Sequence, residues 1–163
     1  IWLGANLGTA FLASAVINIF EDTIEKVVAL AILMPIVASM GGVAGSQTLT
    51  LAIRSEALGQ LVDSNQIWLI KRELAVGAIN GFVWAAIVAA AATIVFDDML
   101  LGGIIASALI INLLIAALAG AVLPGVLKSI GADPAISGSV VLTTITDVVG
   151  FMSFLGLASF FYA

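Results

Sequence analysis

The sequence predicts an all-α membrane protein with five transmembrane helices. Its 163 residues are 63% hydrophobic and 9% charged, whereas an average soluble domain has about 25% charged residues. A helix needs about 20 apolar residues to cross ~30 Å of hydrocarbon, and charged clusters divide this chain into five stretches of at least that length. The apolar runs are also uninterrupted, unlike the alternating strands of a membrane barrel. We therefore expect a single transmembrane domain over residues 1–163.

The first two spans are expected at residues 1–20 and 24–53. The first ends before the acidic Glu21, and it lacks the basic leader and the small-residue cleavage site of a signal peptide. The second ends before Arg54 and is long enough to tilt or to extend past the bilayer.

The remaining three spans are expected at residues 67–96, 100–127 and 135–163. Lys71, Arg72 and Glu73 near the start of the third span are interpreted as an interfacial anchor. An acidic turn at Asp97–Asp98 separates the third and fourth spans, and we interpret this turn as solvated. The fourth span ends before Lys128.

The distribution of basic residues predicts the orientation, because Lys and Arg accumulate in cytoplasmic loops. Arg54 and Lys71 flank the second connection and Lys128 lies in the fourth, whereas the first and third connections are mainly acidic. This pattern places the N-terminus in the cytoplasm and the C-terminus outside. We expect a multi-pass protein of the inner or plasma membrane, in contact with membrane lipid.

The composition excludes several classes of function. The chain has no Cys and no His, so disulfides, thiolate ligands and imidazole chemistry are absent and any bound metal would meet oxygen ligands. The net charge is −5 and no basic run is present, so nucleic acid is not an expected partner.

Asp147 is the most informative single residue, because no Lys, Arg or His lies between Ala135 and Ala163 to neutralise it. An unpaired acid in a span costs on the order of 2.5–3.5 kcal/mol, so such a residue is expected to face a cavity or a cation. Ser139 and Thr143 precede it at intervals of four and share its helix face, and Gly150 continues that face. In a purely structural alternative, Asn112, Gln47 or a neighbouring hydroxyl would satisfy the carboxyl group.

The second span carries a second unusual segment. Pro35 precedes Gly41, Gly42 and Gly45, and the polar residues Ser46, Gln47 and Thr48 follow. Proline removes a helix hydrogen bond and paired glycines ease unwinding, so irregular backbone here would offer carbonyls to a cation. The alternative is a kinked helix with a close-packing patch. These oxygen groups suit Mg²⁺, which keeps its water and is held through one or two carboxylates, although Na⁺ and H⁺ also remain open.

Two motifs in this order are similar to those of a known family. Pro35 followed by Gly41-Gly42-Val43-Ala44-Gly45-Ser46-Gln47, and later Thr146-Asp147-Val148-Val149-Gly150-Phe151, resemble the membrane domain of the MgtE family of magnesium transporters. The resemblance extends over essentially the whole chain.

The resemblance implies a homodimer whose pore lies at the dimer interface, lined by the second and fifth helices, and which carries hydrated Mg²⁺ as the transported ion. Asp147 corresponds to the metal-binding residue. The ion pathway would be lined by Thr143, Ser139, Gly150, Gly41, Gly42, Val43 and Gln47. Typical members also have cytosolic regulatory domains, which the resemblance implies as partners outside these residues. Ser139 and Val43 stand where asparagine is usual, and these departures bear on ion selectivity and conduction rate.

Three other functions are compatible with parts of this pattern. A Na⁺- or H⁺-coupled carrier of a small solute would also use Asp147 as its cation site. An intramembrane aspartyl protease needs two carboxylates that share a proton, and Asp147 is the one Asp that we expect deep in the membrane, so we do not expect an enzyme. A purely structural subunit would carry no ion flux.

Overall fold

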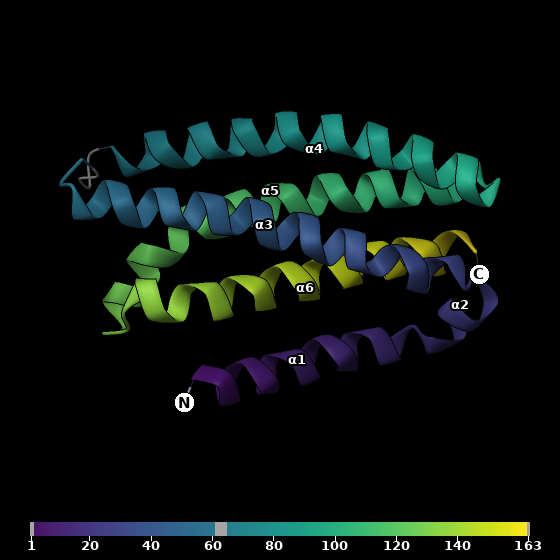
Figure 1. Cartoon of the computed structure of the whole chain (residues 1–163), viewed down its shortest axis with the longest axis horizontal. Helices are drawn as coiled ribbons and strands as arrows, with labels where there is room; N and C mark the ends of the chain where they lie inside the picture. Colours follow the sequence, from purple (N-terminus) through teal and green to yellow (C-terminus); the bar gives the residue numbers. More distant parts are fainter. Residues whose placement is uncertain (1, 61–64, 163) are drawn as a thin grey trace.

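A computed structural model describes residues 2–60 and 65–162, and it consists of one short and five long helices. The long helices lie lengthwise beside one another (Figure 1). In chain order the elements are α1 (Trp2–Ile19), α2 (Glu21–Lys26), α3 (Ala29–Ala57), α4 (Gln66–Phe96), α5 (Met99–Ser129) and α6 (Pro134–Phe161).

The prediction of five apolar helices is confirmed, since α1, α3, α4, α5 and α6 are all long and apolar enough to cross a membrane. The second span was expected to begin at Ile24, whereas Ile24 lies in α2 and α3 begins at Ala29. The backbone turns at Val27, where φ is −128° and ψ is 80°. The charged residues of α2 thus form a separate connecting element, which keeps them out of the apolar part of α3.

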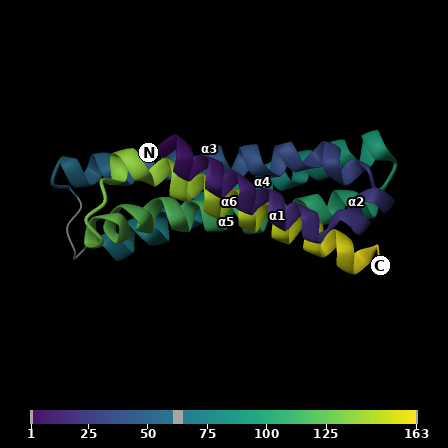
Figure 2. The ribbon, with the colours of Figure 1, turned by 90° about the horizontal axis from the view of Figure 1, so that it is seen from below.

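Helix α5 forms the centre of the bundle, because it packs against α3, α4 and α6. Its buried side chains include Ile105, Leu109 and Leu113. Helix α1 lies at the outside of the bundle, where its main contact is with α6 (Figures 1 and 2). The two helices that carry the predicted motifs, α3 and α6, also contact each other directly.

Small residues allow the close approach of α5 to its neighbours, as is usual in membrane bundles. A Cβ atom on Gly77 of α4 would lie 2.8 Å from the Cβ of Ala117, and one on Gly120 would lie 2.7 Å from the carbonyl oxygen of Gly45 in α3. By contrast, Gly4 and Gly8 of α1 have no such neighbour within 4 Å. Gly77 and Gly120 therefore serve helix packing.

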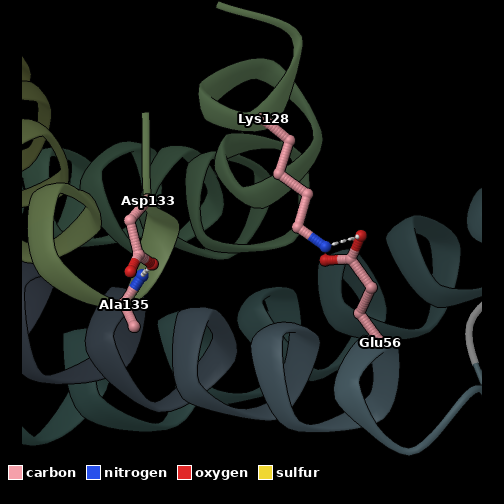
Figure 3. Close-up of polar contacts among 4 residues, drawn as sticks. All are labelled: Glu56, Lys128, Asp133 and Ala135. Carbon is pink, nitrogen blue, oxygen red and sulfur yellow. Dashed lines mark hydrogen bonds and ion pairs between the residues drawn. The ribbon is translucent and has the colours of Figure 1, made fainter. Parts of the chain in front are cut away.

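Polar contacts fix the helix ends. Asp133 accepts a hydrogen bond from the backbone N–H of Ala135 at 2.9 Å and so caps α6. Lys128 at the end of α5 pairs with Glu56 at the end of α3, with 2.6 Å between Nζ and Oε1 (Figure 3). These contacts hold together the bundle end at which α3 and α5 finish and α6 begins.

At the opposite end, Asp98 links α5 to α6. Its Oδ1 caps α5 by accepting a hydrogen bond from Leu101 N at 3.0 Å, while its Oδ2 accepts one from the hydroxyl of Tyr162. The hydrogen bond from Tyr162, followed by that from Leu101, lowers the pKa of Asp98 below its usual value. Burial together with the Asp98 carboxylate raises the pKa of Tyr162.

Candidate cation site

A groove of about 810 Å³ runs between α3 and α6. Helix α3 supplies most of its lining and α6 supplies the carboxylate. The lining residues are Ala38, Ser39, Gly42, Val43, Ser46, Gln47, Thr50, Leu51 and Arg54 of α3, with Thr143 and Asp147 of α6.

The α3 wall follows from helical periodicity, since residues three and four apart share one helix face. Ser39, Gly42 and Ser46 recur at this spacing along the groove. The Ser46 hydroxyl donates to the Gly42 carbonyl oxygen at 2.7 Å, which leaves its oxygen free to accept from water. Val43 contributes an apolar side chain that is 57% exposed. The wall is therefore mixed, with small, hydroxyl and amide groups beside one valine.

The α6 wall presents Asp147 one helical turn after Thr143. The Thr143 hydroxyl donates to the carbonyl oxygen of Ser139 at 2.9 Å and to that of Val140 at 3.1 Å. Asp147 is half-buried, and within the described residues no hydrogen bond or ion pair reaches its carboxylate. The carboxylate is therefore available to a cation that enters the groove.

The structure brings together five of the residues predicted for the site, which are Gly42, Val43, Gln47, Thr143 and Asp147. Ser139 is exposed but lies outside the groove lining. Sequence reasoning did not anticipate the other polar lining residues Ser39, Thr50 and Arg54. Helical spacing places them on the same face of α3 as Gly42 and Val43, and this pattern would have predicted that they line the groove.

Gly41 and Gly150, which were expected along the pathway, are buried and face Asn112 of α5 instead. A Cβ atom on Gly41 would lie 2.3 Å from Asn112 Nδ2, and one on Gly150 would lie 2.8 Å from the same atom. Asn112 is fully buried, and its Nδ2 donates to the carbonyl oxygen of Val37 at 2.9 Å. Asn112 thus lies between the two groove helices and does not satisfy Asp147.

Helix α3 remains helical from Ala29 to Ala57, with Pro35 in its interior. The expectation of unwound backbone at Gly41 and Gly42 is therefore wrong, and no carbonyls are freed there as ligands. Buried Gly41 makes room for the Asn112 side chain, so the close-packing alternative accounts for it. Gly42 faces the groove, where a Cβ atom would meet nothing within 4 Å.

The donor groups of the groove suit a cation that keeps its water. Apart from Arg54, the polar side chains that line the groove are hydroxyls, one amide and one carboxylate, and no cluster of three or more acidic side chains occurs in the described part of the chain. A dehydrated Ca²⁺ ion takes six to eight oxygen ligands, whereas Mg²⁺ keeps several waters and needs only one or two carboxylates. The single Asp147 fits the second pattern.

Comparison with known proteins decides the family. The family model MgtE, described as a divalent cation transporter, matches residues 34–157, which include every residue that lines the groove. The chain belongs to the MgtE family. This family consists of transporters, in keeping with the expectation that the chain is not an enzyme. With its five apolar helices, this MgtE chain is a multi-pass protein of the cell membrane.

Three curated relatives carry the name magnesium transporter MgtE. The Bacillus subtilis protein is 32% identical over 160 residues, covering 98% of this chain and 36% of the relative. The Thermus thermophilus protein is 30% identical over 158 residues, covering 96% and 35%. The Enterococcus faecalis protein is 27% identical over 160 residues, covering 98% and 35%. This MgtE chain thus spans about a third of the length of these relatives.

Proposed function

We propose that this chain forms a passive pathway for Mg²⁺ and selects the hydrated ion at Asp147. The observation that carries the proposal is a half-buried intramembrane carboxylate that faces a groove and has no partner among the described residues. Membership of a family of divalent cation transporters, and relatives named magnesium transporters, support the choice of Mg²⁺.

Selection at Asp147 follows from charge and hydration. Mg²⁺ dehydrates reluctantly, so it passes the site with its water shell and interacts with the carboxylate through that shell. The amide of Gln47 and the oxygens of Ser46 and Thr143 are placed to exchange hydrogen bonds with these waters. A dication gains about twice the Coulomb energy of Na⁺ from the same carboxylate at the same distance, which favours Mg²⁺ over monovalent ions.

The groove supplies one side of this pathway, and a second copy of the chain supplies the other. Its walls come from α3 and α6, the same two helices that the family resemblance assigns to a pore at a homodimer interface. In such a dimer two Asp147 carboxylates face one ion, so their combined charge balances that of Mg²⁺. We infer from the basic connections that the N-terminus lies in the cytoplasm.

Measuring Mg²⁺ flux in the absence of any Na⁺ or pH gradient tests the proposal. The full chain is reconstituted into liposomes that contain a Mg²⁺ indicator, with equal Na⁺ concentration and pH on both sides. We expect Mg²⁺ to enter down its own gradient, faster than in protein-free liposomes. Entry that occurs only when a Na⁺ or pH gradient is imposed would instead indicate the coupled carrier.

A further inference from the structure

A second polar hollow, of about 260 Å³, lies between α3, α4 and α5. Gln47 and Leu51 of α3 line both this hollow and the groove, so the two cavities adjoin the same stretch of α3. The hollow contains Glu73, which the sequence suggested was part of an interfacial anchor. In the structure Glu73 is only 6% exposed.

Glu73 has little to compensate its charge. Its Oε2 accepts one hydrogen bond, from the hydroxyl of Thr48 at 3.2 Å. Among the described residues the ion pair found is that of Lys128 with Glu56, and none involves Glu73. A buried carboxylate in a membrane helix is costly unless it is paired or coordinates a cation, so Glu73 has the same requirement as Asp147.

The rest of the hollow offers oxygen atoms and space. The hydroxyl of Thr48 and the side-chain amides of Gln47 and Asn80 line it together with Glu73. Six water molecules occupy about 180 Å³ at ~30 Å³ each, so the hollow has room for an ion with a six-water shell. The donor types and the volume both suit a hydrated divalent cation.

A basic side chain also lies at this hollow. Arg72 also lines it, but its guanidinium lies over the ring of Trp68, with 5.7 Å from Cζ to the ring centroid. Arg72 is exposed. Its charge therefore repels a cation in the hollow without being bonded to Glu73.

We propose that this hollow is a second cation site, separate from the groove, in which Glu73 and Thr48 hold a hydrated divalent cation. Arg72 at its edge lowers the affinity of the site. The proposal does not depend on transport, because it concerns binding at a different carboxylate.

Mn²⁺ binding to the full chain in lipid nanodiscs tests the proposal, with free Mn²⁺ measured by electron paramagnetic resonance at fixed pH. Asp147→Asn is present in every sample so that the groove carboxylate does not contribute. Onto this background we add Glu73→Gln, Arg72→Gln or, as the control, Glu25→Gln in the exposed helix α2. We expect Glu73→Gln to weaken Mn²⁺ binding by about tenfold or more, Arg72→Gln to strengthen it, and the control to leave it unchanged.

Two results would overturn the second site: no Mn²⁺ binding on the Asp147→Asn background, or the same affinity with and without Glu73→Gln. Should Glu73→Gln fail to fold, Thr48→Val takes its place, because it removes a ligand hydroxyl and keeps the side-chain volume. Unchanged Mn²⁺ affinity in both Thr48→Val and Arg72→Gln would then reject the proposal. A failure of Mg²⁺ flux in liposomes would leave these binding results unaffected.

Discussion

At the scale of single residues, the groove carries two opposite charges, of which the negative one is the Asp147 carboxylate. Arg54 also lines the groove, but no ion pair joins it to Asp147 in the described structure. Arg54 lies in the last turn of α3. The connection that follows is basic, and the sequence predicts that it lies in the cytoplasm. Repulsion from Arg54 and attraction to Asp147 both double for a dication compared with a monovalent ion, so Arg54 disfavours cations at its end of the groove and Asp147 favours them further in.

Asp98 provides a prediction of pH dependence. Because hydrogen bonds from Tyr162 and Leu101 lower the pKa of Asp98 in the folded protein, its contribution to stability is present above the unfolded pKa of about 3.9 and is lost as pH falls through the lower folded value. We expect the Tm of the detergent-solubilised chain to fall below about pH 4, and to fall less steeply in Tyr162→Phe. Circular dichroism measures both curves. Parallel pH curves for the native chain and Tyr162→Phe would contradict this role of the hydroxyl.

At the scale of elements, adjacent glycines of α3 have different roles. A Cβ atom at Gly41 would lie 2.3 Å from Asn112 Nδ2, whereas one at Gly42 would meet nothing within 4 Å. We expect Gly41→Ala to destabilise the chain by about 1–3 kcal/mol through overpacking, and Gly42→Ala to leave stability nearly unchanged. Thermal unfolding of the two variants in detergent measures the difference.

Asn112→Ala serves as the partner in a double-mutant cycle, because it removes the atoms that a Cβ at Gly41 would meet. The cost of Gly41→Ala should therefore be smaller on the Asn112→Ala background than on the native one. Equal costs on both backgrounds would show that Asn112 does not limit the space available at Gly41.

The behaviour of α3 shows what the sequence could and could not predict. Proline and glycine suggested unwinding, because their local propensities weaken a helix. The helix is continuous, and the bond that Asn112 makes to the Val37 carbonyl comes from a residue 75 positions away. Glu73 was misinterpreted for a related reason, since it follows two basic residues and its burial depends on α3 and α5. Contacts between residues this far apart in the chain leave no local pattern in a single sequence.

At the scale of the whole molecule, hydropathy predicted the five spans well, because the apolar length needed to cross a bilayer is a property of the local sequence. The lack of an ion-pair partner for Asp147 within its own span was also predictable, since residues 135–163 contain no Lys, Arg or His. The position of α5 at the centre of the bundle was not predicted, because all the spans are strongly apolar and hydropathy does not rank them by burial.

The orientation of the bundle is testable because the native chain has no cysteine. Single cysteines are introduced at Asp97, between α4 and α5, or at Leu58, just after α3, and intact cells are treated with a membrane-impermeant maleimide. We expect Asp97→Cys to be labelled in intact cells and Leu58→Cys only after permeabilisation, since basic connections stay in the cytoplasm. The reverse labelling pattern would place the N-terminus outside.

The most direct test of the central claim is Mg²⁺ uptake into indicator-loaded liposomes by the native chain and by Asp147→Asn, with no Na⁺ or pH gradient. Asparagine keeps the shape of the side chain and removes its charge, so the account predicts an increase of about tenfold or more in the Mg²⁺ concentration needed for half-maximal uptake. Glu25→Gln, in the exposed helix α2, is the matched control and should behave as the native chain. Saturable uptake in Asp147→Asn with unchanged Mg²⁺ affinity would contradict selection of the ion at Asp147.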